Sequence, residues 1–167
     1  SYTPGAADAD GTVVIDGVTT AFSSVEGLNL SGLGGDDSLT ANATAGNDTI
    51  TYQPGLNDDG QLQINSNTSL SFSSIENRTI DSGTGADTLT VTAGGSDDAI
   101  DVLAGSVVTV NNESVTHVHD STNDNLVLVA GDGDDTVTIA AAHGWTTIDV
   151  QGGSPSASDT ATVTGDG

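Results

Sequence analysis

The sequence predicts an all-β fold, a parallel β-solenoid (β-helix or β-roll-like) of about three repeats, each 48 to 50 residues long. The first observation is an internal repeat: Phe22-Ser-Ser-Val-Glu26 returns fifty positions later as Phe72-Ser-Ser-Ile-Glu76, and Leu128 follows Ile80 by 48 positions. The second is a series of short clusters of Thr, Val, Ile and Leu separated by Gly-Asp turns, a pattern typical of short strands. Repeated units that cannot bury their own apolar face usually stack on one another.

Each repeat is expected to contain five short strands, the first two joined as a hairpin. In the first repeat they cover 13–15, 18–22, 28–30, 38–40 and 49–52; in the second, 62–64, 70–72, 79–80, 88–91 and 99–102; in the third, 108–110, 115–118, 126–129, 136–139 and 147–150.

Stacking of equivalent strands would place equivalent apolar residues in buried ladders. The expected ladders are Leu39, Leu89 and Val137; Ile50, Ile100 and Ile148; and Leu30, Ile80 and Leu128. An antiparallel β-sandwich is the alternative, because evenly spaced short strands also suit that architecture. The solenoid is favoured because a sandwich gives no reason for near-identical turns at a constant offset.

The chain is expected to form one repeat-array domain over 1–167, with approximate repeats 11–59, 60–104 and 105–153 and a partial unit over 154–167. An array that stops partway through a unit favours a piece of a longer array or end-to-end assembly of copies.

The charge of the chain limits its partners. Of the acidic residues 21 are Asp and 3 are Glu, Arg78 is the sole Lys or Arg, and the net charge is −23. Such a chain repels nucleic acid and anionic membranes, so cations are the expected partner. With no cysteine, disulfides and thiolate metal sites are excluded. No apolar run approaches membrane-spanning length.

The turns share one design, in which glycines precede an Asp that stands two residues before an apolar residue, as in Gly83-Thr-Gly85-Ala-Asp87-Thr-Leu89. Glycine permits positive φ at the turn, and flexible loops rich in carbonyl and carboxylate oxygens suit Ca²⁺. Adjacent carboxylates such as Asp36-Asp37, Asp97-Asp98 and Asp134-Asp135 repel one another without a cation.

The Gly-x-Gly-x-Asp-x-Leu core resembles the RTX, or hemolysin-type, calcium-binding repeat, which binds Ca²⁺ between adjacent turns of a parallel β-roll. The resemblance implies carboxylate ligands from Asp37, Asp87 and Asp135 on one edge and from Asp48 and Asp98 on another, with Asp36, Asp97 and Asp134 beside them and carbonyls near Gly35, Gly85 and Gly133. The Phe-Ser-Ser-Val/Ile-Glu block is similar to longer repeats in giant secreted bacterial surface proteins and adhesins.

The sequence departs from the RTX pattern in its spacing. The Asp residues are separated alternately by 11 positions (37 to 48) and 39 positions (48 to 87), and Thr146 occupies the position where a third Asp of one series is expected. Two other hypotheses therefore stay open: that the turn aspartates only cap local amides, and that the acidity is an adaptation to salt.

An enzymatic function is not expected. A polysaccharide lyase on a β-helix needs basic side chains, and only Arg78 is present. His117 and His119 face the same side of a strand and, with Asp120, are a candidate metal or acid-base site, although they are expected to be ordinary exposed strand residues. His143 and Trp145 are a candidate sugar contact, although Trp145 is expected to be a packing aromatic.

The predicted function is that of a calcium-binding structural module of a secreted or cell-surface bacterial protein: an adhesin stalk, spacer or filament subunit. The expected partners are calcium ions, further copies or repeats end to end, and surface glycans. One alternative is a polysaccharide-binding or polysaccharide-modifying β-helix. Another is an ice-binding solenoid, in which Ser38 and Thr40, Thr88 and Thr90, and Thr136 and Thr138 stack as an outward ladder.

Overall fold

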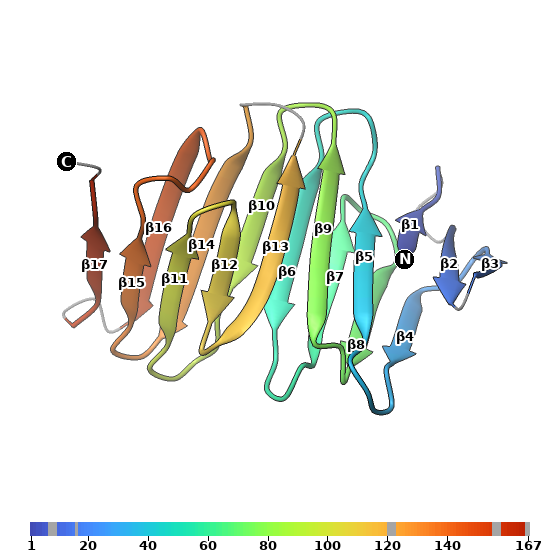
Figure 1. Cartoon of the computed structure of the whole chain (residues 1–167), viewed down its shortest axis with the longest axis horizontal. Helices are drawn as coiled ribbons and strands as arrows, with labels where there is room; N and C mark the ends of the chain where they lie inside the picture. The colour runs from blue at the N-terminus through green and yellow to red at the C-terminus, as the bar shows by residue number, and fades with distance from the viewer. Residues whose placement is uncertain (7–9, 16, 120–122, 155–157, 166–167) are drawn as a thin grey trace.

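A computed structural model of the chain describes residues 1–6, 10–15, 17–119, 123–154 and 158–165. Every regular element among these residues is a β-strand (Figure 1). The strands are β1 (Tyr2–Pro4), β2 (Gly11–Ile15), β3 (Val18–Phe22), β4 (Gly27–Ser31), β5 (Ser38–Asn42), β6 (Thr49–Pro54), β7 (Gly60–Ile64), β8 (Ser69–Ser73), β9 (Asn77–Gly83), β10 (Thr88–Thr92), β11 (Ala99–Leu103), β12 (Val107–Val110), β13 (Glu113–His119), β14 (Asn125–Asp132), β15 (Thr136–Ile139), β16 (Thr147–Ser154) and β17 (Thr160–Val163).

The all-β prediction is confirmed, and each predicted strand lies within an observed one. The three predicted repeats correspond to β2–β6, β7–β11 and β12–β16. Strands β1 and β17, at the two ends of the chain, were not predicted.

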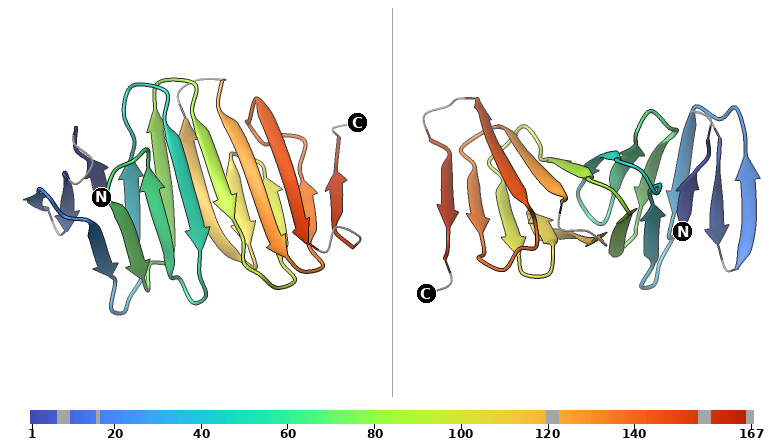
Figure 2. Two further views of the ribbon diagram at one scale, coloured as in Figure 1. Left: turned by 180° about the vertical axis from the view of Figure 1, so that it is seen from behind. Right: turned by 90° about the horizontal axis from the view of Figure 1, so that it is seen from above.

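The strands form two mixed sheets. A ten-stranded sheet has the order β17-β15-β11-β12-β13-β9-β5-β1-β2-β3, and a seven-stranded sheet has the order β16-β14-β10-β6-β7-β8-β4. Figure 2 shows the molecule from behind, with the seven-stranded sheet toward the viewer, and from above. Outside three antiparallel meanders (β1–β3, β6–β8 and β11–β13), consecutive strands alternate between the sheets and pair in parallel with strands further along the chain. We call one passage of the chain through both sheets a coil.

The expected ladders are wrong, because equivalent strands of successive repeats lie on opposite sheets. Leu39 is on β5 of the ten-stranded sheet, whereas Leu89 is on β10 of the seven-stranded sheet. The reason is that the chain crosses between the sheets three times in each repeat, an odd number, so the next repeat starts on the other sheet. The observed ladders therefore join non-equivalent residues: Ile50 lies beside Leu89, then Leu126, then Ile148. The other two expected ladders are split between the sheets in the same way.

The outward threonine ladder is also split. Thr88 and Thr90 are on the seven-stranded sheet, beside Thr49 and Thr51 of β6. Thr136 and Thr138 are on the ten-stranded sheet, where they pair with Thr160 and Thr162 of β17. Ser38 and Thr40 pair with Asn77 and Thr79.

Between the sheets lies one cluster of buried apolar side chains that reaches from Tyr2 to Trp145. The repeat is visible in its aromatic residues, since Tyr2 stacks on Phe22 and Tyr52 stacks on Phe72 with centroid distances of 6.5 and 6.4 Å. A Cβ atom on Gly11 or Gly60 would lie 2.5 Å from the facing phenylalanine ring, which explains why both positions are glycine.

The connections between the sheets gather on two edges. Those that lead from the seven-stranded to the ten-stranded sheet form the lower edge in Figure 1, and those that lead back form the upper edge. The predicted turn aspartates all lie in these connections.

Candidate functional site

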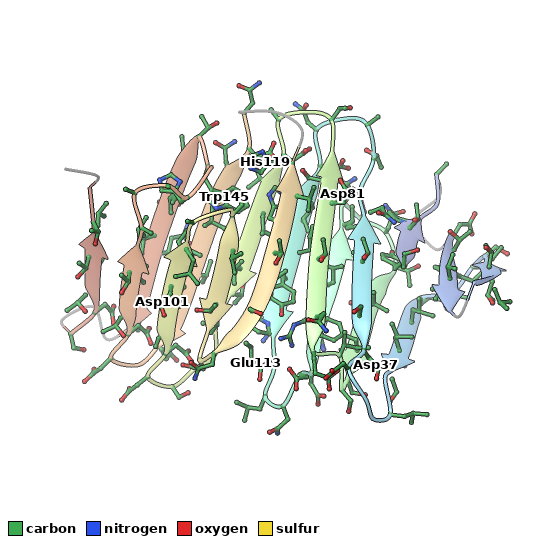
Figure 3. All side chains as sticks on the ribbon, in the orientation of Figure 1. Asp37, Asp81, Asp101, Glu113, His119 and Trp145 are labelled. Atoms are coloured by element: carbon green, nitrogen blue, oxygen red, sulfur yellow. The ribbon has the colours of Figure 1, made fainter. Side chains whose placement is uncertain are left out.

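The turn aspartates are divided between the edges differently from the prediction. Asp37, Asp98 and Asp135 lie in connections on the lower edge, and Asp48 and Asp87 lie on the upper edge. Figure 3 labels Asp37 at the lower edge. The predicted grouping of Asp37 with Asp87 and Asp135 is wrong for the same reason as the ladders: each repeat places its turns on the opposite edge from the last.

On the upper edge, carboxylates of one coil accept amide hydrogen bonds from the previous coil. The Asp48 N–H donates to Asp87 Oδ1 at 2.7 Å. The Asp87 N–H donates in turn to Asp124 Oδ1 at 3.1 Å. The upper row is therefore Asp48, Asp87 and Asp124, each directly before a strand.

The lower edge repeats this arrangement with other residues. The Asp98 N–H donates to Asp135 Oδ1 at 2.8 Å, and the Asp135 N–H donates to Asp159 Oδ1 at 3.1 Å. Nearer the N-terminus, the Asp37 N–H donates to Glu76 Oε2 at 2.7 Å. These bonds tie successive coils together and agree with the hypothesis that the aspartates cap amides, although across coils as well as within a turn.

Asp48 and Asp98 have their carboxylates bound by donors from the protein. Asp48 accepts hydrogen bonds from the Thr44 N–H and hydroxyl and from the Asn65 side-chain amide. Asp98 accepts them from the Gly94 N–H and the Asn111 side-chain amide. These two carboxylates hold the turn against the meander, and the asparagines also accept from the Thr49 and Ala99 amides.

Asp37, Asp87 and Asp135 differ, because one carboxylate oxygen of each is buried and lacks a hydrogen-bond partner within the described structure: the Oδ2 atom in all three. Asp87 is 0% and Asp135 1% exposed. Burial raises the pKa of both carboxyl groups above the ordinary value, and the amide hydrogen bonds from Asp48 and Asp98 offset part of the rise. A buried, unpaired carboxylate oxygen is costly unless a proton or a cation meets it.

The neighbouring aspartates Asp36, Asp97 and Asp134 are exposed. Asp97 Oδ1 accepts a hydrogen bond from the Asp134 N–H at 2.9 Å, and Asp134 accepts one from the Ser158 hydroxyl. Their positions continue the stacking of turns but place their carboxylates toward solvent.

The three glycines of the predicted motif share one backbone conformation. Gly35, Gly85 and Gly133 have φ of 128°, 143° and 139°. A Cβ atom on Gly85 would lie 2.5 Å from the Gly46 carbonyl oxygen, because turns of adjacent coils approach closely there. The predicted positive φ is confirmed at all three glycines. Gly85 and Gly133 face main-chain carbonyl groups of the previous coil, whereas the space beside Gly35 is open.

The described residues contain no group of three or more His, Asp or Glu side chains arranged to hold a metal ion. A cation at Asp87 or Asp135 would therefore depend on main-chain carbonyls and water for most of its ligands, as Ca²⁺ accepts. The unpaired Oδ2 atoms fit such an ion, whereas the fully engaged carboxylates of Asp48 and Asp98 fit it poorly.

A second polar cluster brings together residues that the sequence named as two separate candidates: His117 and His119 with Trp145. The His117 ring stacks on Trp145 at 4.4 Å and on His119 at 5.5 Å between centroids. His117 Nε2 lies 3.9 Å from Asp124 Oδ2, and neither ring nitrogen of His117 has a hydrogen-bond partner among the described residues. Burial lowers the pKa of His117 to about 4, partly opposed by Asp124. Asp120 lies outside the described residues.

This cluster packs as part of the core: Trp145 packs as expected, whereas the expected exposure of the histidines is wrong for His117, which is buried. His117 occupies the ladder position beside Ile80, and the Ser106 hydroxyl, between His119 Nε2 and the His143 carbonyl at 3.0 Å from each, ties the 140–146 connection to β13. Sequence alternation already placed His117 and His119 on one face; the approach of Trp145 had no signal in the sequence.

Arg78 is buried in the ten-stranded sheet beside Leu39. Its guanidinium pairs with Glu113 at 3.0 Å and Asp58 at 3.5 Å and donates to the Ser114 carbonyl. The single arginine is thus engaged by carboxylates of the protein itself.

Within the described part of the chain, no helix has the length and apolarity that crossing a membrane requires. Comparisons of the chain with models of protein families, with curated proteins and with solved structures find no match.

Proposed function

We propose that this chain is a structural repeat module of a secreted or cell-surface protein, a spacer or stalk built as a parallel β-solenoid with inserted meanders. Support comes from the alternation of strands between two sheets and from the parallel pairing of each coil with the next. The polar clusters contribute to packing: Arg78 forms an ion pair with Glu113, and His117 is buried in the core. These features agree better with a structural role, which depends on shape and stiffness, than with a role that depends on a binding pocket.

Calcium is the ion that the proposal assigns to the turns. The observation that carries it is the unpaired, buried Oδ2 atom that recurs at the equivalent residues Asp37, Asp87 and Asp135. When bound, Ca²⁺ would supply positive charge between stacked turns of a chain whose net charge is −23.

The residues of this chain divide the work. Asp87 and Asp135 each use Oδ1 to hold the amide of the previous coil and leave Oδ2 for the ion. Asp48 and Asp98 orient the turns through Thr44, Asn65, Gly94 and Asn111. Folding and ion binding are then coupled, since stacked coils are needed to form the site.

Calorimetric titration of the metal-free chain with Ca²⁺ tests this proposal. We expect Ca²⁺ to bind the original chain, and fewer ions to bind Asp87→Asn and Asp135→Asn. Asp101→Asn should bind as many ions as the original chain, because residue 101 lies in the middle of β11 and not in a turn. The asparagine variants keep an oxygen that can accept the amide hydrogen bond, so loss of the ion is separated from loss of the fold. Absence of Ca²⁺ binding, or equal binding by all variants, would contradict the calcium assignment.

Stability in chelator gives a second measurement. We expect EDTA to lower the melting temperature of the original chain, and to lower the melting temperature of Asp87→Asn by a smaller amount. A melting temperature that is the same in millimolar Ca²⁺ and in excess EDTA would rule out a stabilising ion.

A further inference from the structure

The four edge strands at the ends of the sheets carry little charge and have exposed apolar residues. Strands β3 and β4 form one end, and β16 and β17 form the other. Asp149 is the sole charged residue in these four strands, all of them within the described chain. Val18 and Val163 are 66% and 71% exposed. Natural proteins usually protect such edges with charges, proline or bulges, because a free edge can pair with another strand.

Within the chain, two pairs of consecutive strands meet in the same way at two places, and the strands at the two ends of the molecule match the two sides of such a junction. In the first instance β4 and β5 pair in parallel with β8 and β9. In the second, β9 and β10 pair with β13 and β14. Each time, two consecutive strands, one per sheet, meet the last strand of a meander and the strand after it.

The two ends of the molecule have the same arrangement of strands as the two sides of this junction. Strands β16 and β17 are consecutive, one per sheet, while β3 is the last strand of a meander and β4 is the strand after it. Because β16 is in the seven-stranded sheet and β3 in the ten-stranded sheet, the two halves match only after a half-turn about the long axis. That half-turn reverses the strand direction and exchanges the sheets, so the new pairs stay parallel.

We propose that a second copy of this chain docks head to tail after such a half-turn, with β3 pairing with β16 and β4 pairing with β17. The inference rests on the solenoid architecture proposed above but does not require calcium. It would continue both sheets and the stacking of turns, since Asp159, which directly precedes β17, would then lie beside the β3–β4 connection.

Apolar surface and charge both favour the ends over the sides. The end strands carry apolar side chains that are only partly buried against the core: Leu28, Leu30, Ile148 and Val150. Docking would bring Leu28 and Leu30 against β17, and Val150 against β3. Elsewhere a chain with a net charge of −23 repels its copies, so association at the nearly uncharged ends costs least.

The test uses Val18→Asp and Val163→Asp, one at each end, with Val118→Asp as the matched control. Val118 is 46% exposed on β13, away from both ends. In sedimentation velocity, the original chain and the control should form concentration-dependent oligomers, and each end variant should sediment as a monomer. An equimolar mixture of the two end variants should form dimers and nothing larger, because each retains one intact and complementary end.

Engineered cysteines test the half-turn, and the chain offers a clean background because it has no cysteine. Thr162→Cys on β17 should form an intermolecular disulfide with Asn29→Cys on β4 and not with Ala21→Cys on β3. A disulfide to Ala21→Cys alone would overturn the half-turn, since it would mean that β17 meets β3.

Failure of the assembly can be told from failure of the proposed function. A chain that binds Ca²⁺ and is folded by circular dichroism, but stays monomeric at high concentration in both Ca²⁺ and EDTA, would overturn the docking alone. Equal loss of oligomers in Val118→Asp would also overturn it. Oligomers that form without any Ca²⁺ binding would support the docking and contradict the calcium assignment.

Discussion

The hydrogen bond between Asp87 and the previous coil gives the most direct test of how the coils are held together. The bond is 2.7 Å long, and its donor residue, Asp48, is 3% exposed. Asp87→Ala removes a charge-assisted bond and leaves a buried amide without an acceptor, which together cost about 2 to 4 kcal/mol. It also removes the unpaired Oδ2 atom, which returns part of that free energy. We expect a net loss of about 2 kcal/mol in the free energy of unfolding.

Asp87→Asn separates the bond from the charge. Its side-chain oxygen still accepts from the Asp48 N–H, so in metal-free buffer its free energy of unfolding should stay within about 1 kcal/mol of the original value. The assay is urea denaturation followed by circular dichroism, with the midpoint and the m-value fitted together. If Asp87→Ala matched the original chain, or if Asp87→Asn were as unstable as Asp87→Ala, the carboxylate row would not hold the coils in this way.

Four further outcomes follow from the structure. Leu126→Ala should cost about 3 kcal/mol in the free energy of unfolding measured in urea, because the side chain is 0% exposed between Leu89 and Ile148. Gly85→Ala should lower the melting temperature, because φ is 143° and a Cβ atom would lie 2.5 Å from the Gly46 carbonyl oxygen; an unchanged value would contradict the close approach. His117→Leu should raise the urea midpoint, since both buried ring nitrogens lack partners, and a lower midpoint would contradict that cost. In metal-free His117→Leu, urea titrations should show stability rising as pH falls toward about 4, the ordinary value for an aspartate, because the raised pKa values of Asp87 and Asp135 make the folded state bind more protons. In the original chain the gain should be smaller, because the pKa of about 4 for His117 makes the unfolded state bind the extra proton in that range.

The strands were predictable because each carries its own local signal. Alternating apolar residues and Gly-Asp turns indicate where a strand begins and ends, and each such signal lies within a few residues of the strand itself. Strand β17 was missed because Thr160–Val163 is four exposed residues with no apolar anchor of its own inside the core.

The choice of sheet was not predictable from an offset of fifty residues. The offset shows that Leu39 and Leu89 have the same local environment, and they do: each follows a turn aspartate and is buried. It does not show on which sheet they lie, which depends on how many strands intervene and on which of these stay in the same sheet as a meander. Strand β6 pairs with β7, so the predicted hairpin of β7 and β8 is part of a three-stranded unit.

The sequence predicted part of the candidate site. Asp48, Asp87, Asp98 and Asp135 were predicted from the turns as ligands, whereas the residues that complete the rows were not among the predicted ligands: Asp124, Asp159 and Glu76. Asp124 carries the same signal as Asp87, an Asp two residues before a buried leucine, and lacks only the preceding glycines. Whether a carboxylate keeps a free oxygen depends on side chains such as Asn65, which lies 17 residues from Asp48 in sequence.

The odd number of crossings between the sheets in each repeat also determines how such a chain can grow or shrink. Gain of one whole repeat moves everything beyond it to the opposite face of the molecule, whereas gain of two restores the original facing. Any surface feature that must point in a fixed direction, such as a loop that contacts a neighbour, therefore constrains repeats to be added or lost in pairs.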